Sequence, residues 1–573
     1  MSTDRMSRIA IAAAASLMLL SWSAPNHYRP WTSFHAELAT ALALIVAGSW
    51  ALWHYRAEPR HVPYLALVAL AAALIPLVQL QTGVVFFAGD FWIVALYLLG
   101  FAIAQIIGFR IAAADGIDRV FAFFSWVVLT GSLLSVYIAL YQWQQLDYLW
   151  IFAEPLPPHG RPGANFAQPN HLATLLVLGL TGIAYLRERA RFGGRVTLLL
   201  VAFLGFGLAM TQSRAGLLAA TLIAGWLLLK RGDLSARLAP KRVLTAYAIL
   251  LLCAGAWMFL ATLSTVPVGR SLTEAATGGV RWVHWSVLLD AVSRKPWSGY
   301  GWNQVAFAQA TAAPSHPMTG EIVEHSHNLL IDLLVWNGVP LGLLLVGALV
   351  WWLWTAMRRA RDPATVMAAA SVLAVTVHAM FEFPMEYAYF LLPTGLLMGA
   401  ISASVAPQAS LRLPAGLLTV LATAATAVTA VVVMDYLAIE EDMRVIRFEE
   451  ARIGTQKPRT EPPPTLLLTQ LEGFLRFARD HARADMTPAQ LDSMRKAVSR
   501  YPYSYSTLRY ATALALNDRP ELARSALLPI CKTHPPSACE SARLHWEALG
   551  KNEPRIAAIG WPWPKAPAES ELQ

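Results

Sequence analysis

The stretch EHSHNLLIDLLVWNGVPLG, residues 324–342, decides how this chain is interpreted. A glutamate and two histidines, Glu324, His325 and His327, stand directly before an apolar run of membrane-spanning length. Ionisable side chains are therefore expected at a boundary between water and lipid, which is a common position for a functional site. The rest of the sequence indicates which side of a membrane this boundary faces and which other charged groups can reach it.

The composition is that of a polytopic membrane protein. Of the 573 residues, 56% are hydrophobic and only 14% are charged, whereas charged residues make up about a quarter of an ordinary soluble domain. The net charge of +9 does not indicate a nucleic-acid-binding protein, because the basic residues lie in short clusters between apolar segments.

Apolar runs of the ~20 residues needed to cross about 30 Å of hydrocarbon occur about thirteen times. Their backbones must be helical, because lipid offers no hydrogen-bond partners. The predicted fold class is therefore all-α, a polytopic membrane protein with about 12–13 transmembrane helices. The first run follows Arg5 and Arg8, so a cleavable signal peptide is the alternative there. The runs lie near residues 9–24, 36–54, 62–80, 91–111, 120–141, 171–187, 196–211, 215–230, 243–263, 328–356, 364–380, 388–405 and 414–435.

Clusters of Lys and Arg follow every second run, which is the pattern of loops retained in the cytoplasm. The segments between them, residues 142–170, 264–327 and 378–387, then face outward. Since the number of crossings is odd, residues 436–573 also lie outside. The clusters are Arg56 and Arg60; Arg110 and Arg119; Arg187, Arg189, Arg191 and Arg195; Lys230, Arg231, Arg237, Lys241 and Arg242; Arg358, Arg359 and Arg361; and Arg412.

The C-terminal quarter has a different composition. Residues 1–435 form the predicted transmembrane domain, 436–465 a linker that contains the breaker-rich KPRTEPPPT, and 466–573 a helical domain that resembles tetratricopeptide repeats weakly. This domain either docks a protein partner or caps the membrane domain. An oxidising compartment favours a disulfide between Cys531 and Cys539, with two free thiols as the alternative.

Two outward segments carry arginines. Arg214 lies in TQSRAGLLA at an outer helix junction, where a side chain that simply extends to the interface is the plainer interpretation. Arg281 and His284 are spaced three apart in GGVRWVHW, on a predicted helix flanked by Trp282 and Trp285. The tryptophans suit a helix that lies along the membrane surface.

Two further segments carry polar groups near outer helix ends. In GRPGANFAQPNHLATLL, Asn170 follows a proline and is expected to cap a helix, with His171 in its first turn and Gln168 just before it. In HAMFEFPMEYAY, Glu382 recurs at helical spacing with His378, although the nearby interface also accounts for an acid there.

These segments resemble the bacterial O-antigen ligase and polymerase superfamily, in particular its protein O-oligosaccharyltransferases. The ligase motif matches His327, Asn328 and Gly338, but its last position departs, with Leu341 there and Gly342 one later. GANFAQPNHLATLL, SRAG, RWVHW and the EFP that follows His378 are similar to family stretches too. The resemblance covers residues 160 to about 400; the first 150 match only as generic membrane helices.

The resemblance implies transfer of a preassembled glycan from undecaprenyl diphosphate to a hydroxyl, on the periplasmic face of the bacterial inner membrane. Acceptors would be Ser or Thr of periplasmic or pilin-type proteins. Arg214 and Arg281 are expected to stabilise the diphosphate leaving group, and His327 to act as the base. No metal and no cofactor are expected. The predicted substrate-binding residues are Gln168, Asn170, His171, His284, Glu324, His325, Asn328 and Glu382.

Two alternatives remain open. An O-antigen ligase that acts on lipid A core, or an O-antigen polymerase, would use the same donor with a different acceptor. A transporter of lipid-linked sugar belongs to another class. The suspect charges gather at one outer face and no inverted repeat is visible, which disfavours a transporter.

Overall fold

The computed structural model describes residues 3–56, 58, 61–157, 160–263, 281–453 and 461–564. Within these ranges the chain is almost entirely helical, and two three-residue strands, β1 (His61–Pro63) and β2 (Ser410–Arg412), form one antiparallel pair. The predicted all-α class is confirmed. Part of the expected outer loop, residues 264–280, lies outside the described residues.

The chain divides into two compact units, each assembled from three separate stretches of sequence. Unit 1 comprises Met1–Ala73, Leu96–Thr277 and Ala348–Thr429, and unit 2 comprises Leu74–Ala95, Gly278–Gly347 and Ala430–Gln573. Three of the five boundaries fall inside long helices that contribute to both units: α5 (Ala88–Asp115), α14 (Leu329–Arg359) and α17 (Ala415–Glu450). The helix α17 runs past residue 436, where the linker was expected to begin.

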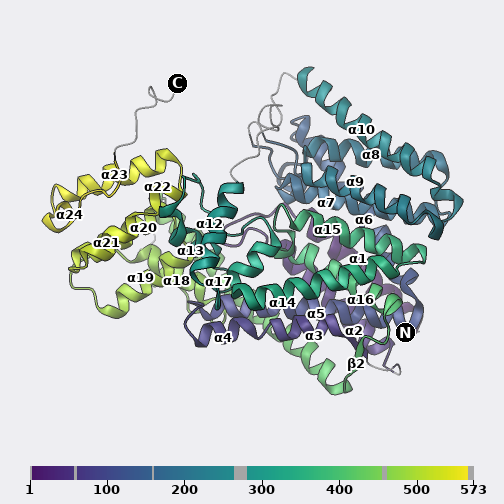
Figure 1. Cartoon of the computed structure of the whole chain (residues 1–573), viewed down its shortest axis with the longest axis horizontal. Helices are drawn as coiled ribbons and strands as arrows, with labels where there is room; N and C mark the ends of the chain where they lie inside the picture. The colour runs from purple at the N-terminus through teal and green to yellow at the C-terminus, as the bar shows by residue number, and fades with distance from the viewer. Residues whose placement is uncertain are drawn as a thin grey trace. The chain divides into compact units, whose positions relative to one another are not determined.

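Unit 1 holds most of the apolar helices (Figure 1). Besides its parts of the three shared helices, they are α1 (Thr3–Ser23), α2 (Phe34–His54), α3 (Tyr64–Ala72), α6 (Ile117–Trp143), α7 (Pro169–Glu188), α8 (Gly194–Thr211), α9 (Arg214–Leu229), α10 (Pro240–Leu263), α15 (Pro363–Ala379) and α16 (Ala388–Val405). Short 3-10 turns join them at Trp150–Phe152, Ala164–Phe166, Arg231–Asp233, Ala236–Leu238 and Pro384–Glu386.

The core of unit 1 depends on close helix contacts. A side-chain carbon at Gly108 of α5 would come within 1.9 Å of the Leu396 carbonyl oxygen on α16, and one at Gly399 of α16 would come within 1.9 Å of the Gln105 carbonyl oxygen on α5. Only glycine permits this approach, as is usual where membrane helices cross closely. Most residues of the helix α7 are buried, and Leu172, Leu175 and Leu176 are fully buried.

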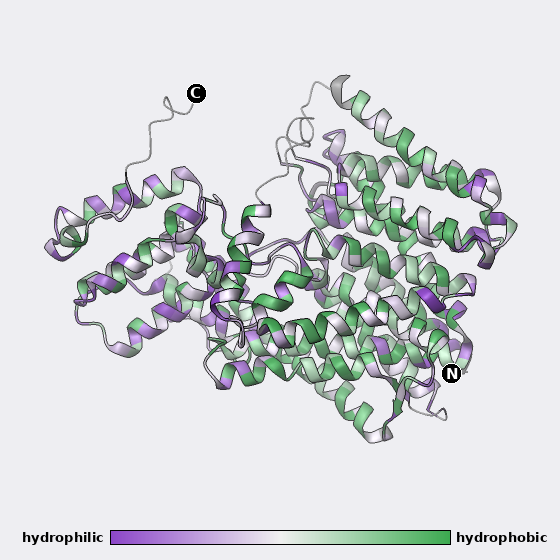
Figure 2. Ribbon diagram, viewed as in Figure 1, coloured by the Kyte–Doolittle hydropathy of each residue, from purple (hydrophilic) through white to green (hydrophobic). Residues whose placement is uncertain are grey.

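Unit 2 combines short polar helices with the ends of membrane helices. Between residues 281 and 315 it contains α12 (Arg281–Arg294), α13 (Val305–Ala312) and the turn Ala313–Ser315. The short helix α4 (Ile75–Gln81) belongs to the same unit. Its C-terminal helices alternate polar and apolar residues, unlike the apolar helices of unit 1 (Figure 2). They are α18 (Thr469–Arg479), α19 (Pro488–Arg500), α20 (Ser504–Leu516), α21 (Pro520–Leu527), α22 (Ile530–Thr533), α23 (Pro536–Gly550) and α24 (Pro554–Ile559).

Eleven candidate spans in the described part of the chain are long and apolar enough to cross a membrane. Two further apolar helices are shorter: α9 has 16 residues and α15 has 17. The chain is therefore a polytopic membrane protein. The likeness of α18–α24 to tetratricopeptide repeats stays a prediction, as do the domain boundaries at residues 435 and 466.

Candidate functional site

The segment EHSHN is held by hydrogen bonds at the start of α14. The Ser326 amide donates to Asp332 Oδ1 at 2.7 Å, and Ser326 Oγ donates to the Asn328 carbonyl oxygen at 2.7 Å. Asn328 Oδ1 accepts the amide of Leu330 at 3.0 Å, as an N-cap does. His327 stands between these anchored residues with a φ of 58°, a left-handed conformation that is rare outside glycine.

The helix α12 packs beside this segment within unit 2. Trp285 Nε1 donates to the Ser326 carbonyl oxygen at 2.8 Å. One residue earlier, His284 is 1% exposed, with its Nδ1 3.7 Å from Glu321 Oε1. Its Nε2 is buried and finds no hydrogen-bond partner among the described residues. The side chain of Trp282 on the same helix is exposed, as expected of an interfacial helix.

Electrostatics links His284, His327 and Arg281. Burial lowers the pKa of His284, and the nearby charges of His327 and Arg281 lower it further, against the opposing effect of Glu321. Arg281 is the first residue of α12 and is half-buried. In unit 2 the charges of Arg281 and His327, both of the predicted set, therefore each act on His284.

His325 keeps part of its surface exposed, but protein atoms crowd its ring. This burial lowers the pKa of His325 to about 3, and the charges of His327 and Arg500 act in the same direction. The imidazole of His325 is therefore neutral at physiological pH. A neutral imidazole is a poor ligand for an anion.

Sequence reasoning missed a buried ion pair in unit 2. Arg500 Nε lies 3.0 Å from Asp90 Oδ1, and the two side chains are 13% and 1% exposed. Tyr503, three residues after Arg500, donates its hydroxyl to Glu324 Oε1 at 3.3 Å. The partners Arg500 and Asp90 are 410 residues apart, so no local pattern joins them. An acid in the first turn of an apolar span, as Asp90 is, was the available signal.

Four other predicted residues lie in unit 1 and form their own cluster: Gln168, Asn170, His171 and Glu382. Gln168, not Asn170, caps α7: its Oε1 accepts the Asn170 amide at 3.2 Å. The cap falls there because Pro169 occupies the first helical position, where a missing amide hydrogen costs nothing. Asn170 instead donates through Nδ2 to Glu382 Oε1 at 2.9 Å.

His171 is packed into the interior of unit 1. It is 1% exposed, and its Nδ1 lies 3.0 Å from the hydroxyl of Tyr389. The ring centroids of His171 and His378 lie 5.7 Å apart. Nδ1 of His378 is 2.6 Å from Thr174 Oγ1. A position so enclosed fits a packing role for His171.

Arg214 opens α9 and is exposed. The turn before it is fixed by Gln212 at a φ of 48° and by Ser213 Oγ, which accepts the Gly216 amide at 3.1 Å. Arg161, which sequence reasoning missed, donates from Nη1 to the Thr211 carbonyl oxygen at 3.0 Å. The local chain therefore presents the Arg214 guanidinium at a helix N-terminus, which is a favourable place for an anion.

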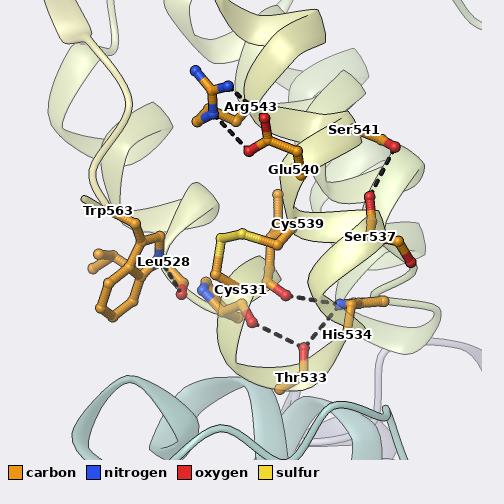
Figure 3. The surroundings of a disulfide bond; sticks show 12 residues. Leu528, Cys531, Thr533, His534, Ser537, Cys539, Glu540, Ser541, Arg543 and Trp563 are labelled. Carbon is orange, nitrogen blue, oxygen red and sulfur yellow. Dashed lines mark hydrogen bonds and ion pairs between the residues drawn. A yellow bond between two sulfur atoms is a disulfide. The ribbon is translucent and has the colours of Figure 1, made fainter. Parts of the chain in front are cut away.

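A disulfide joins Cys531 to Cys539 in unit 2 and ties α22 to α23 (Figure 3). Lys532, the next residue, reaches the outer loop: its carbonyl oxygen accepts the Thr319 amide at 2.8 Å, and its Nζ donates to the His316 carbonyl oxygen at 2.8 Å. The disulfide therefore lies next to contacts that hold the loop leading to residue 324.

The chain is similar to known families and proteins. Residues 198–346 match the family described as O-Antigen ligase, residues 162–186 match Protein glycosylation ligase, and residues 366–548 match Virulence factor membrane-bound polymerase, C-terminal. A General O-oligosaccharyltransferase of Acinetobacter baylyi is 29% identical over 540 residues, 91% of each chain. A ComP-specific O-oligosaccharyltransferase of the same organism is 28% identical over 384 residues, 66% of this chain and 68% of its own.

The matched ranges contain most of the residues described above. The O-Antigen ligase match includes Arg214, Arg281 and His327, and the Protein glycosylation ligase match includes Asn170 and His171. The similarity to the first relative also extends well beyond residues 160–400, where the sequence motifs were recognised. The chain therefore resembles the O-antigen ligase superfamily and protein O-oligosaccharyltransferases, and it is a glycosyl-transferring membrane enzyme.

Proposed function

We propose that this enzyme transfers a preassembled oligosaccharide from undecaprenyl diphosphate to Ser or Thr hydroxyls of periplasmic or pilin-type proteins. The reaction would take place at the outer face of the bacterial inner membrane, with the C-terminal helices in the periplasm. The match of residues 162–186 to Protein glycosylation ligase supports a protein acceptor. The Cys531–Cys539 disulfide supports an oxidising compartment.

The proposed chemistry is a displacement at the anomeric carbon of the donor sugar. The acceptor oxygen forms the new glycosidic bond while the bond from that carbon to the diphosphate oxygen breaks. His327 takes the proton from the acceptor hydroxyl, and the polyprenyl diphosphate leaves with the bonding electron pair. Guanidinium groups suit the stabilisation of that departing charge, because they are planar and permanently protonated. We assign this role to Arg281 and Arg214.

The observation that carries the proposal is the setting of His327. Its neighbours Ser326 and Asn328 are both fixed by hydrogen bonds, and it precedes a membrane-spanning helix by two residues. The charges of Arg281 and His327 both act on His284, which is therefore a neighbour of each. A base and a cation at the mouth of a membrane helix are what a reaction between a lipid-linked donor and a water-borne acceptor requires.

Substitution of the three proposed catalytic residues tests this assignment. We expect His327→Ala, Arg281→Ala and Arg214→Ala each to lower transfer by about 100-fold or more, the usual effect of losing a general base or a charge-stabilising donor. The assay is transfer of lipid-linked glycan to a pilin-type protein by purified full-length enzyme, followed by mass spectrometry. The exposed His545→Ala and Arg519→Ala are matched controls and should keep wild-type rates. Wild-type rates for His327→Ala and Arg281→Ala would remove the proposed site.

A second candidate function has support in two of the family matches. The descriptions O-Antigen ligase and Virulence factor membrane-bound polymerase point to glycan transfer onto lipid A core or onto another glycan. Each acceptor class can be supplied separately with the same donor. Glycosylation of lipid A core, with the pilin-type protein unmodified, would favour this alternative over a protein acceptor.

The predicted substrate contacts of unit 1 remain part of the proposal. Asn170 and Glu382 hold each other at 2.9 Å near an outer helix end, where a glycan can be bound by hydrogen bonds. Asn170→Ala and Glu382→Gln are expected to raise KM for the donor by several-fold with little effect on kcat, since they bind and do not react. A fall in kcat with unchanged KM would assign them to the chemical step instead.

A further inference from the structure

Arg500, at the end of α19, is a buried charge that the reaction described above does not use. Its side chain is 13% exposed, and Asp90, its partner at 3.0 Å, is 1% exposed. Removing two charges from water costs several kcal/mol per ion before their attraction is counted, so such pairs are weak evidence for stability alone. A buried pair that connects the C-terminal helices to the first turn of α5 therefore calls for a functional explanation.

The surroundings of Arg500 lead to the segment that contains His327. The guanidinium lies over the ring of Tyr501 at 4.8 Å, and Tyr503 donates its hydroxyl to Glu324 Oε1. Burial disfavours the charge of Arg500, but Asp90, Tyr501 and Glu324 outweigh it, so that the pKa of Arg500 rises above its ordinary value. The same charge acts on His325. Arg500 is therefore permanently charged and within electrostatic reach of Glu324 and His325.

Glu324 itself is exposed. Within unit 2 it contacts the C-terminal helices through its hydrogen bond with Tyr503. A carboxylate on an exposed loop would otherwise turn freely into water. The attraction to Arg500 and the hydrogen bond from Tyr503 both hold Glu324 in one direction. Because His327 lies only three residues further along, a change in the direction of Glu324 is transmitted through a short stretch of backbone.

We propose that Arg500 and Tyr503 are positioning residues for glycan transfer. They fix Glu324, and through it the orientation of His327, so that the helices α19 and α20 are an integral part of the catalytic unit. This inference rests on the function proposed above. It assigns α19 and α20 a role that differs from a separate docking module for the acceptor.

Positioning and docking affect different kinetic constants, kcat and KM for the acceptor. Misplacement of a catalytic base by about 1 Å can cost 100-fold in rate without weakening substrate binding. Loss of a docking surface would instead raise KM for the acceptor. The split between kcat and KM therefore separates positioning from docking.

The experiment uses purified full-length enzyme, a polyprenyl-diphosphate-linked glycan and a pilin-type acceptor. We expect Tyr503→Phe, which removes one hydroxyl, to lower kcat about 3- to 10-fold, and Arg500→Ala about 100-fold, with both KM values within about twofold of wild type. Arg500→Lys should recover part of the loss. The matched controls are Tyr505→Phe, the exposed neighbour of Tyr503, and Arg519→Ala, an exposed arginine of the same segment.

A double variant tests whether the residues act through Glu324. If they do, Tyr503→Phe combined with Glu324→Gln should be no slower than Glu324→Gln alone, because the hydroxyl then has nothing left to position. Multiplied effects of the two substitutions would overturn the proposal, as would a raised acceptor KM with wild-type kcat. Tyr503→Phe keeps the proposal testable if Arg500→Ala does not fold.

The outcome is distinguishable from failure of the proposed function. If His327→Ala is inactive but Arg500→Ala and Tyr503→Phe turn over at the wild-type rate, the positioning role is wrong and the catalytic assignment stands. If His327→Ala is itself active, the catalytic assignment is wrong, whatever the Arg500 variants do.

Discussion

Asn328 explains at the level of one side chain why a small polar residue follows the motif histidine. Its Oδ1 accepts the amides of Leu330 and Ile331 at 3.0 and 3.4 Å, and so caps α14. Asn, Ser and Asp are among the best N-cap residues because their short side chains reach back to free helix amides. The motif residue therefore fixes where the membrane helix begins and, with it, where His327 stands.

Substitution of the cap is expected to act on stability and activity together. Asn328→Ala should lower the free energy of unfolding by about 0.5–2 kcal/mol and reduce transfer, whereas Asn328→Ser should stay close to wild type, because serine caps equally well. Thermal unfolding in detergent and turnover of the same samples measure both effects. If Asn328→Ser lost as much activity as Asn328→Ala, the amide would be a substrate contact and not a cap.

The depressed pKa of His325 gives a pH dependence. In the folded chain the pKa is about 3, against 6.5 for an unperturbed histidine. Between these values the unfolded chain binds more protons, so stability falls as the pH is lowered from about 6.5 towards 3. We expect His325→Gln to weaken this acid dependence, measured as the change in Tm between pH 7 and pH 5. An unchanged acid dependence would show that His325 does not contribute.

Individual residues also show where sequence reasoning succeeds. The spacing of EHSHN and RWVHW was enough to select two segments that lie together in unit 2, because each contains ionisable groups beside an interfacial tryptophan or a helix start. The contribution of Arg500 was not predictable. Its partner lies 410 residues away, and a lone arginine before Tyr501 looks like any solvated helix end.

At the scale of elements, most helices follow from apolar runs, but their irregularities do not. The helix α14 contains Gly338 at a φ of 74° and Pro340 two residues later, so that it bends within a run that reads as uniformly apolar. The reason is a close contact: Gly299, also at positive φ, lies against the backbone of Gly338. The sequence marks the glycine, but only the fold supplies its neighbour.

This bend predicts a contrast between two glycines of α14. A side chain at Gly338 would come within 2.6 Å of the Pro296 carbonyl oxygen and would be held at an unfavourable φ, whereas one at Gly347 would meet open space. Gly338→Ala should therefore lower Tm and the yield of folded protein, and Gly347→Ala should leave both unchanged or slightly raised. Equal behaviour of the two variants, compared by size-exclusion profile and thermal unfolding, would mean that the bend is not required.

The Cys531–Cys539 disulfide lies beside contacts that hold residues 316–319. Cys531 adjoins Lys532, whose main chain and Nζ bond to Thr319 and His316. Cys531→Ser with Cys539→Ser should lower the free energy of unfolding by about 2–4 kcal/mol, the usual contribution of a disulfide. It should also increase protease cleavage near residues 316–321. Cys253→Ser, which removes the free thiol, is the matched control, and equal protection in both variants would contradict the role.

For the whole molecule, the sequence predicted the all-α membrane class and the abundance of spans. Each compact unit takes three separate stretches, and three of the five boundaries between them fall inside α5, α14 and α17. The domain boundaries that the sequence predicts at residues 435 and 466 follow the end of the last apolar run and the end of a breaker-rich segment. Long-range pairs such as Asp90 with Arg500 join the early chain to the C-terminal helices, and no periodicity reveals them.

Whether the short helices cross decides the side on which each loop lies. With 16 residues, α9 is about 24 Å long, less than the roughly 30 Å of hydrocarbon. It ends at Leu229, directly before Lys230 and Arg231, whose long side chains can extend to the headgroups and allow a short span to cross. If α9 and α15 cross as well as the eleven longer candidate spans of the described residues, the number of crossings is odd and the two ends of the described chain lie on opposite sides.

Cysteine labelling tests this topology at the two ends of α9. In a Cys253→Ser background, we expect Ala215→Cys to react with a membrane-impermeant maleimide on intact spheroplasts, and Gly232→Cys to react only after the membrane is opened. Gly232 tolerates the change because a side chain there meets open space. Reaction of both cysteines from the same side would show that α9 does not cross. Arg214 and the basic cluster after Leu229 would then share one face, which would contradict the outward placement of the arginine that the proposed reaction needs.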